Sequence, residues 1–132
     1  MQLFNPSIEY GLDLAAVRQS YPKLIERPFC FSAYIPADYN PEIEALSHQL
    51  TFLFGGSSRS LIPSRSLIQG TWGQPIESEA ISKINCFTDR LTLEKNLSAA
   101  IAHSCHTAKL CRQKSVAMEI SRNSIMWEFP LV

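Results

Sequence analysis

The chain has 132 residues, of which 45% are hydrophobic and 18% charged, and its 12 Lys and Arg balance its 12 Asp and Glu. This length matches one domain with one hydrophobic core, and the composition argues against a disordered chain. A net charge of zero gives no general attraction to a polyanion. The charge is uneven, because residues 59–132 hold nine basic residues against six acidic ones, whereas residues 1–58 hold three against six.

The start of the chain lacks the features of a signal peptide. The first basic residue is Arg18, and nothing before it forms an apolar run. The longest apolar stretch, Leu50–Phe54, is far too short to span a bilayer. We therefore expect a cytoplasmic protein without a membrane partner. The four cysteines show no CxxC pairing, which indicates free thiols rather than disulfides.

The first 27 residues predict an arm outside the main domain. Pro6, Gly11 and Pro22 interrupt this region, which leaves room for one short helix around Leu12–Gln19. We therefore expect a single α+β domain over residues 28–132.

The main domain begins with an alternating strand and a capped helix. Residues 29–35 alternate with a period of two, which is typical of a β-strand, and Pro36 ends it. Asn40-Pro41-Glu42 supplies an N-cap, a proline suited to the first helical position and a carboxylate that complements the helix dipole. The apolar residues that follow form one stripe, and Gly55-Gly56 supplies a left-handed stop. These signals predict a helix within Asn40–Phe54.

The segment after the glycines contains the pentapeptide Ser-Arg-Ser-Leu-Ile twice, at 58–62 and at 64–68. Two copies are too few for a repeat architecture. We interpret the first copy as a loop and the second as the start of a strand that runs to Trp72. Gly73-Gln74-Pro75 then predicts a turn, and a second extended run leads from Ile76 to Phe87.

A long helix and two strands complete the chain. Thr88 or Asp89 can cap a helix over about residues 91–110, whose apolar residues again form a stripe. Residues 116–120 alternate, and after a turn at Asn123 residues 125–129 form a last short strand. The succession is typical of a ferredoxin-like βαββαβ sandwich with an extra C-terminal strand, in which both helices cover one face of an antiparallel sheet.

Short motifs within residues 66–120 resemble an uncharacterised family of short bacterial proteins, known only as a domain of unknown function. These motifs are Gly70-Thr71-Trp72, Glu79, Phe87-Thr88-Asp89, and Arg112-Gln113-Lys114-Ser115-Val116 ahead of Glu119-Ile120. The resemblance supports the fold and implies no activity, because no catalytic or cofactor-binding residues are assigned in that family.

We find no motif that predicts catalysis, a cofactor or a metal. Four potential zinc ligands lie on the second helix, but at 100° per residue they point in different directions: His103, Cys105, His106 and Cys111. Glu44 and His48 are four residues apart on an exposed helix face, where a solvated pair accounts for them. We therefore favour a protein that is not an enzyme over an enzyme, and we expect no bound metal and no cofactor.

Two surfaces remain as candidate binding sites. The sheet face away from the helices is expected to carry Tyr34, Ala117 and Glu119, a partly apolar mixture that either the N-terminal arm or another molecule covers. A ligand site around Trp72 is the second candidate, because a ring lies near a cation and two acceptors there: Arg65, Glu77 and Glu79. Alternatively, Trp72 is part of the core and the charges line a hairpin edge.

These surfaces give three hypotheses for the function. The first is a non-enzymatic interaction or assembly module that docks a protein partner, or a second copy in a homodimer, through its open sheet face. The second is a nucleic-acid-binding domain, in which bases stack on the sheet beside the basic C-terminal portion, although the aromatic signature of RNA-binding sheets is absent. The third is a small-ligand-binding protein or enzyme with its site near Trp72. Steep salt dependence would distinguish phosphate binding from protein docking.

Overall fold

The computed structural model describes residues 8–9, 12–63, 80–122 and 126–131. Two compact units divide the chain. The larger, which we call the sheet unit, comprises Arg27–Met126. The smaller, which we call the terminal unit, comprises Met1–Glu26 and Trp127–Val132. The structure thus groups the last residues of the chain with its first, which the sequence did not predict.

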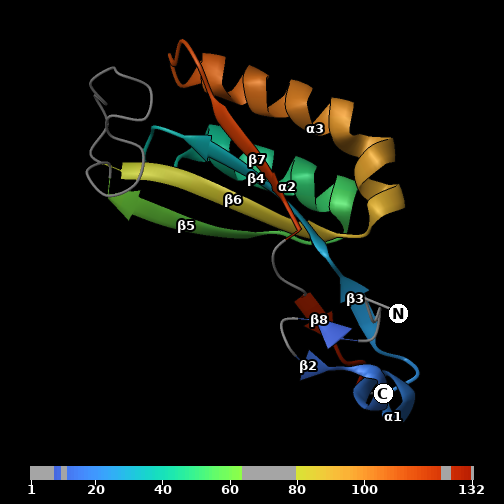
Figure 1. Ribbon diagram of the computed structural model, residues 1–132. Coiled ribbons are helices and arrows are strands. Elements are labelled where there is room, and N and C mark those ends of the chain that lie inside the picture. Colours follow the sequence, from blue (N-terminus) through green and yellow to red (C-terminus); the bar gives the residue numbers. More distant parts are fainter. Residues whose placement is uncertain (1–7, 10–11, 64–79, 123–125, 132) are drawn as a thin grey trace, which may run out of the picture. The chain divides into compact units, whose positions relative to one another are not determined.

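An antiparallel sheet of four strands forms one layer of the sheet unit (Figure 1). Its strands are β4 (Phe29–Ile35), β5 (Ser58–Pro63), β6 (Ala80–Thr88) and β7 (Ala117–Ser121). They lie in the order β5-β6-β4-β7, and every neighbouring pair is antiparallel. The register places Ala33 opposite Ile84 on one side and Met118 on the other. The first of these strands in the sequence, β4, is therefore an inner strand of the sheet.

Two capped helices connect the strands. In α2 (Pro41–Phe54) the side chain of Asn40 accepts a 2.9 Å hydrogen bond from the Ile43 N–H, and Gly55 ends the helix with a φ of 86°. In α3 (Arg90–Leu110) the side chain of Asp89 accepts a 2.8 Å bond from the Thr92 N–H. Both predicted helices are confirmed, because their caps are local signals that the sequence displays directly.

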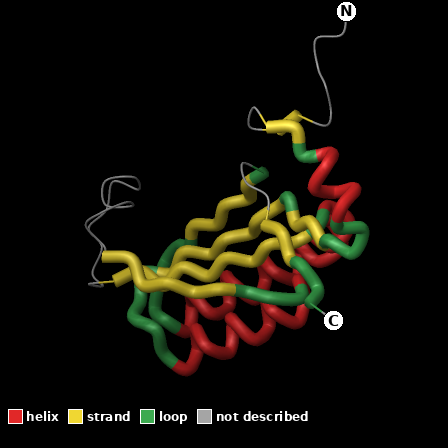
Figure 2. The backbone as a smooth tube through the Cα atoms, turned by 90° about the horizontal axis from the view of Figure 1, so that it is seen from below, coloured by secondary structure: helices red, strands yellow, loops and turns green. Residues whose placement is uncertain are grey.

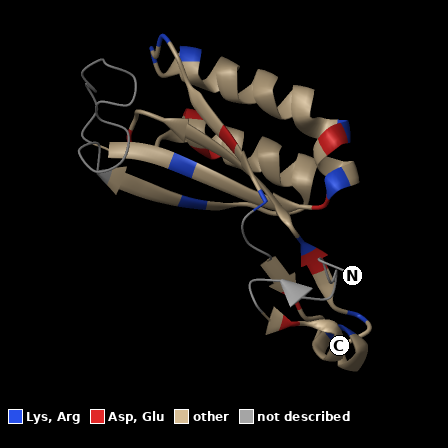
Figure 3. Cartoon of the chain, in the orientation of Figure 1, with Lys and Arg blue, Asp and Glu red and all other residues tan. Residues whose placement is uncertain are grey.

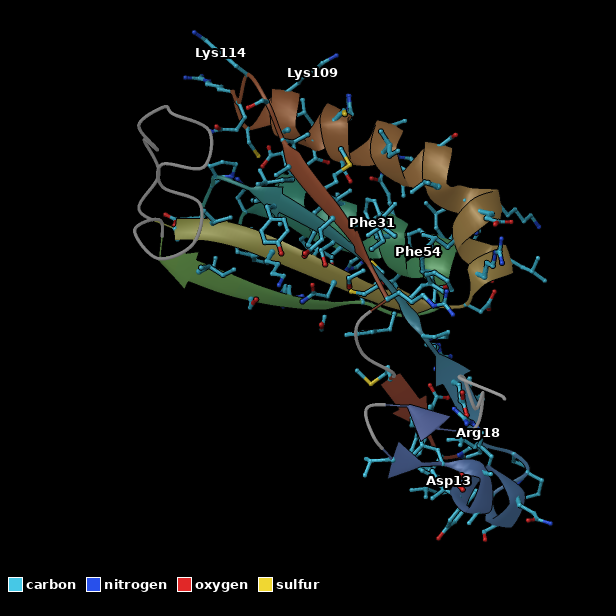
Figure 4. All side chains as sticks on the ribbon, in the orientation of Figure 1. Asp13, Arg18, Phe31, Phe54, Lys109 and Lys114 are labelled. Carbon is cyan, nitrogen blue, oxygen red and sulfur yellow. The ribbon has the colours of Figure 1, made fainter. Side chains whose placement is uncertain are left out.

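Both helices pack against the same face of the sheet (Figure 2). Phe31, Ala33 and Ile35 of β4 are inaccessible to solvent on this face. They form one core with residues of α2, β6 and α3: Ile43, Leu46, Leu50, Phe54, Ile84, Cys86, Leu93 and Ala100. The rings of Phe31 and Phe54 lie 5.8 Å apart, which joins the sheet to the end of α2 (Figure 4). The prediction of an α+β fold with antiparallel strands is thus confirmed.

Strand β5 corrects the interpretation of the first pentapeptide. Residues 58–62 were expected to be a loop, but every one of them pairs with a residue of β6, so the segment is a strand. This strand lies at a sheet edge, where serines and an arginine are tolerated and the half-exposed Leu61 needs no full burial. The strand ends at Pro63, which is acceptable on an edge. The second copy, at 64–68, lies outside the described residues.

The elements other than the four-stranded sheet and its two helices are short. A hairpin of β1 (Ile8–Glu9) and β2 (Leu12–Asp13) precedes α1 (Ala15–Ser20), and β3 (Ile25–Arg27) pairs with β8 (Met126–Glu128). Phe129 makes edge contacts with the rings of both Tyr21 and Trp127. The extra C-terminal strand is therefore present, but it belongs to a separate two-stranded sheet. Across the described ranges, no helix has the length and apolar character needed to cross a membrane.

The core predicts a large difference between two phenylalanines. We expect Phe31→Ala to lower the free energy of unfolding by about 3–5 kcal/mol, because it leaves a cavity between β4 and α2. The matched control is Phe52→Ala, whose side chain on α2 is 89% exposed, and we expect a change within about 0.5 kcal/mol. Urea denaturation followed by circular dichroism measures both. Equal destabilisation would contradict the packing described above.

The cap of α3 predicts a pH-dependent contribution to stability. The hydrogen bond from the Thr92 N–H holds the pKa of Asp89 below its ordinary value. A carboxylate with a lowered pKa stabilises the fold above pH about 4, and this contribution disappears as pH falls through its folded-state pKa. We expect Asp89→Ala to cost about 1 kcal/mol at neutral pH.

The same measurement at acid pH tests the sign. The difference in unfolding free energy between wild type and Asp89→Ala should narrow below pH about 4. Asp89→Asn keeps a side-chain acceptor but does not titrate, so its difference from Asp89→Ala should stay constant. If the difference in unfolding free energy between wild type and Asp89→Ala does not change with pH, the carboxylate charge has no role in the cap.

Candidate functional site on the helix-free sheet face

The face of the four-stranded sheet opposite α2 and α3, here called the helix-free face, carries the candidate site. Directly paired residues share a face, so the register assigns its side chains. From β5 across to β7 they are Ser58, Ser60 and Ile62; Ile81, Lys83, Asn85 and Phe87; Cys30, Ser32 and Tyr34; and Ala117, Glu119 and Ser121. The described part of this face mixes polar side chains with five apolar ones: Ile62, Ile81, Phe87, Cys30 and Ala117.

Tyr34 lies on the inner strand β4, at the end of its ladder with β7, between two opposite charges. Its hydroxyl donates a 2.8 Å hydrogen bond to Oε1 of Glu119 on β7. On the other side, Nζ of Lys83 on β6 lies 5.1 Å from the centroid of the Tyr34 ring. The charge view shows the basic position on β6 and the acidic position on β7 (Figure 3). Three adjacent strands therefore fix one half-buried aromatic side chain.

The environment of Tyr34 keeps its phenol protonated. Partial burial, followed by the hydrogen bond to Glu119, raises the pKa of Tyr34 above its ordinary value of 10.0, and Lys83 opposes part of this shift. At neutral pH the hydroxyl is therefore a hydrogen-bond donor. This group can hold a binding surface in place, but it is not poised to exchange a proton.

Farther along β4, the helix-free face has an uncharged polar network. The hydroxyl of Ser32 donates a 2.7 Å hydrogen bond to Oδ1 of Asn85, its register partner on β6. The sulfur of Cys30 lies 3.5 Å from the same hydroxyl. Ser32 and Cys30 are both buried. Because these groups satisfy one another, this end of the face has a fixed surface of small side chains.

The predicted reason for covering the helix-free face needs correction. The sequence predicted a partly apolar mixture whose apolar side chains would form a large patch exposed to water. In the described residues, however, none of the exposed large hydrophobic side chains belongs to this face, and Ile81 is fully buried. The alternation was identified correctly, but β6 contributes Lys83 and Asn85 to this face. Any partner must therefore recognise shape and charge rather than a large apolar patch.

The structure brings the predicted partner-binding residues together. Ala117 is the register partner of Tyr34, and Glu119 accepts a hydrogen bond from the Tyr34 hydroxyl. Sequence reasoning missed Lys83. Its alternation with Ile84 indicates that the two face opposite ways, but only the pairing of Lys83 with Tyr34 identifies the face. The predicted ligand-site residues lie outside the described part of the chain: Arg65, Trp72, Glu77 and Glu79.

The potential zinc ligands on α3 have different surroundings. His106 is exposed and His103 half-buried, while the sulfur of Cys111 accepts a 3.7 Å hydrogen bond from Nδ2 of Asn40. Within the described ranges, no three His, Cys, Asp or Glu side chains are grouped so that they could hold a metal ion. All four cysteines are free, and burial raises the pKa of Cys86 to about 12, which keeps that thiol protonated.

The electrostatics of Tyr34 predict opposite effects of its two charged neighbours. We expect Glu119→Gln to lower the pKa of Tyr34, because it removes a negative charge that disfavours the phenolate. We expect Lys83→Met to raise it, because it removes the cation that favours the phenolate. Carbon-13 NMR of the labelled tyrosines across alkaline pH measures both, with Tyr34→Phe to assign the signal. Shifts in the same direction would show that the two charges do not flank the ring.

Comparisons of the chain with protein-family models, with curated proteins and with solved structures gave no match. The resemblance of residues 66–120 to an uncharacterised bacterial family therefore gains no support from the family models.

Proposed function

We propose that the protein is a non-enzymatic interaction module that binds a protein partner through the helix-free face. One observation carries the proposal: Tyr34 is held between Lys83 and Glu119 on three adjacent strands. The register partner of Tyr34 on the edge strand β7 is the small residue Ala117, whose side chain is too short to cover the ring. A partner can therefore approach the sheet closely and contact the ring.

A tyrosine held in this way is well suited to binding proteins. Its ring offers a large contact area with few rotatable bonds, and tyrosine is enriched at the centres of interfaces. The hydrogen bond to Glu119 and the contact with Lys83 order the ring before any partner arrives. Preordering reduces the conformational entropy that binding would otherwise cost.

The chemistry of the helix-free face supports binding rather than catalysis. The Tyr34 phenol is protonated at neutral pH, and the Ser32 hydroxyl donates to an amide oxygen rather than to a base. A nucleophilic serine needs a base that accepts its proton. The described residues of this face offer recognition groups without such a pair.

Charge favours a protein over a nucleic acid as the partner. Lys83 and Glu119 are the charged side chains in the described part of the helix-free face, and they cancel. The carboxylate beside the Tyr34 ring would repel a phosphate backbone that approached to stack a base there. Arg59 belongs to the opposite face, where its guanidinium lies 4.3 Å from the centroid of the Tyr39 ring.

We further propose that the sheet unit is a ferredoxin-like βαββαβ sandwich. The element order β4-α2-β5-β6-α3-β7 supports this assignment, as does a sheet with the first and third of these strands at its centre. The four free cysteines are consistent with the reducing conditions of the cytoplasm, where we propose that the protein acts.

Site-specific photo-crosslinking in cells tests the proposed function. A benzophenone amino acid placed at Ser60 reports on the helix-free face while Tyr34 stays intact, and one at the exposed Lys95 on α3 is the control. We expect a protein adduct from position 60, and none from position 95. The identified partner, once purified, should bind the Tyr34→Glu variant at least about tenfold more weakly than wild type.

Other crosslinking results would overturn the proposal. An adduct between position 60 and residues 1–27 of the same chain would mean that the N-terminal arm covers the face. A nucleic-acid adduct, together with binding that weakens steeply with salt, would establish the alternative function. Protein adducts from position 95 alone would locate the interface on the helices.

A further inference from the structure

We infer that the partner of the helix-free face is a second copy of the chain. The two copies pack face to face and are related by a two-fold axis that lies between the two sheets, parallel to β4. This inference rests on the proposed function and specifies the partner. Its basis is the arrangement of charge: the cation of Lys83 lies on β6, the carboxylate of Glu119 lies on β7, and β4 with Tyr34 runs between them.

The positions of these charges select one symmetry. A two-fold axis along β4 places β6 of one copy over β7 of the other, which brings Lys83 towards Glu119 of the second copy twice. A two-fold axis across the strands would place β6 over β6 and thus bring like charges together. Because like charges facing one another are costly, the first arrangement is favoured.

The register allows the two charges to meet. Lys83 is paired with Tyr34, whereas Glu119 is paired with Ser32, two residues along β4. This offset is about 7 Å along the strand, which the long side chains of lysine and glutamate can span. Tyr34 of each copy then lies near the axis, where the two rings meet.

The size of the helix-free face predicts a weak dimer. With four strands about 4.8 Å apart and a central strand of seven residues at about 3.4 Å each, one face covers at most roughly 450 Å². Cys30, Ser32 and Ile81 are already buried, so the area that a second copy can cover is smaller still. Two such faces fall below the lower limit of about 1,200 Å² for stable complexes. We therefore expect a reversible dimer with a Kd in the micromolar range or weaker.

Charge reversal tests the inference on the full chain. Sedimentation velocity over a wide concentration range should show dimerisation of the wild type and a Kd at least about tenfold higher for Lys83→Glu and for Glu119→Lys. The double variant, with both charges exchanged, should return to within about threefold of wild type. The matched controls are Lys95→Glu on α3 and Glu44→Lys on α2, both exposed, which should leave the Kd unchanged.

Mixing the two single variants is the decisive measurement. Lys83→Glu carries acids at both positions, and Glu119→Lys carries bases at both, so a heterodimer has only attractive pairs. With one variant labelled with nitrogen-15, native mass spectrometry should show a heterodimer in excess of either homodimer. Loss of a contact within one chain could not be rescued in this way.

Two results would overturn the inference. A wild type that stays monomeric at all concentrations would exclude a second copy as the partner. In that case, an adduct from position 60 to a different protein would still support the proposed function. A wild-type dimer whose weakened variants show no heterodimer on mixing would exclude the axis along β4. Circular dichroism of every variant ensures that loss of association does not reflect loss of folding.

Discussion

The alternation of side chains along β4 is the constraint on which the rest of the structure depends. This strand pairs on both sides, so its position is set by β6 and β7 together. Burial of Phe31, Ala33 and Ile35 against the helices commits the residues between them to the opposite face. A slip of one residue would exchange the two sets and place polar groups in the core. The core therefore fixes the orientation of Tyr34.

This coupling gives the candidate site its rigidity. On β4, Tyr34 lies between Ala33 and Ile35, which are both fully buried in the core. Its hydroxyl and ring contact the two adjoining strands, β7 and β6. Side chains on such a scaffold lose little freedom when a partner binds. The helices contribute indirectly: the caps stabilise α2 and α3, and the contact of Phe54 with Phe31 packs α2 against the sheet.

The elements that the sequence predicted best are those with local signals. Asn40 and Asp89 cap helices within their own turns, and Gly55 ends α2 through its own backbone conformation. Strand β5 was missed because an edge position removes the need for apolar alternation, which is the usual signal of a strand. The pairing of β8 with β3 was missed because alternation predicts a strand but not its partner.

The candidate site was predictable only in part, for the same reason. Tyr34 and Glu119 were assigned to one face from the alternation of their own strands. The hydrogen bond between them, and the place of Lys83 beside them, depend on register, which no local pattern encodes. The ligand-site hypothesis around Trp72 concerns residues outside those that the structure describes.

The central position of β4 also determines when the site can form during synthesis. The hydrogen bond of Tyr34 joins residues 85 positions apart, and that of Ser32 spans 53. On a ribosome that makes the chain from its N-terminus, β4 emerges long before either of its neighbours. Its apolar face must wait for β6, and the site is complete only when β7 has been made. Such non-local pairing slows folding. Because β6 and β7 are made late, an incomplete chain exposes β4 without presenting the Tyr34 site.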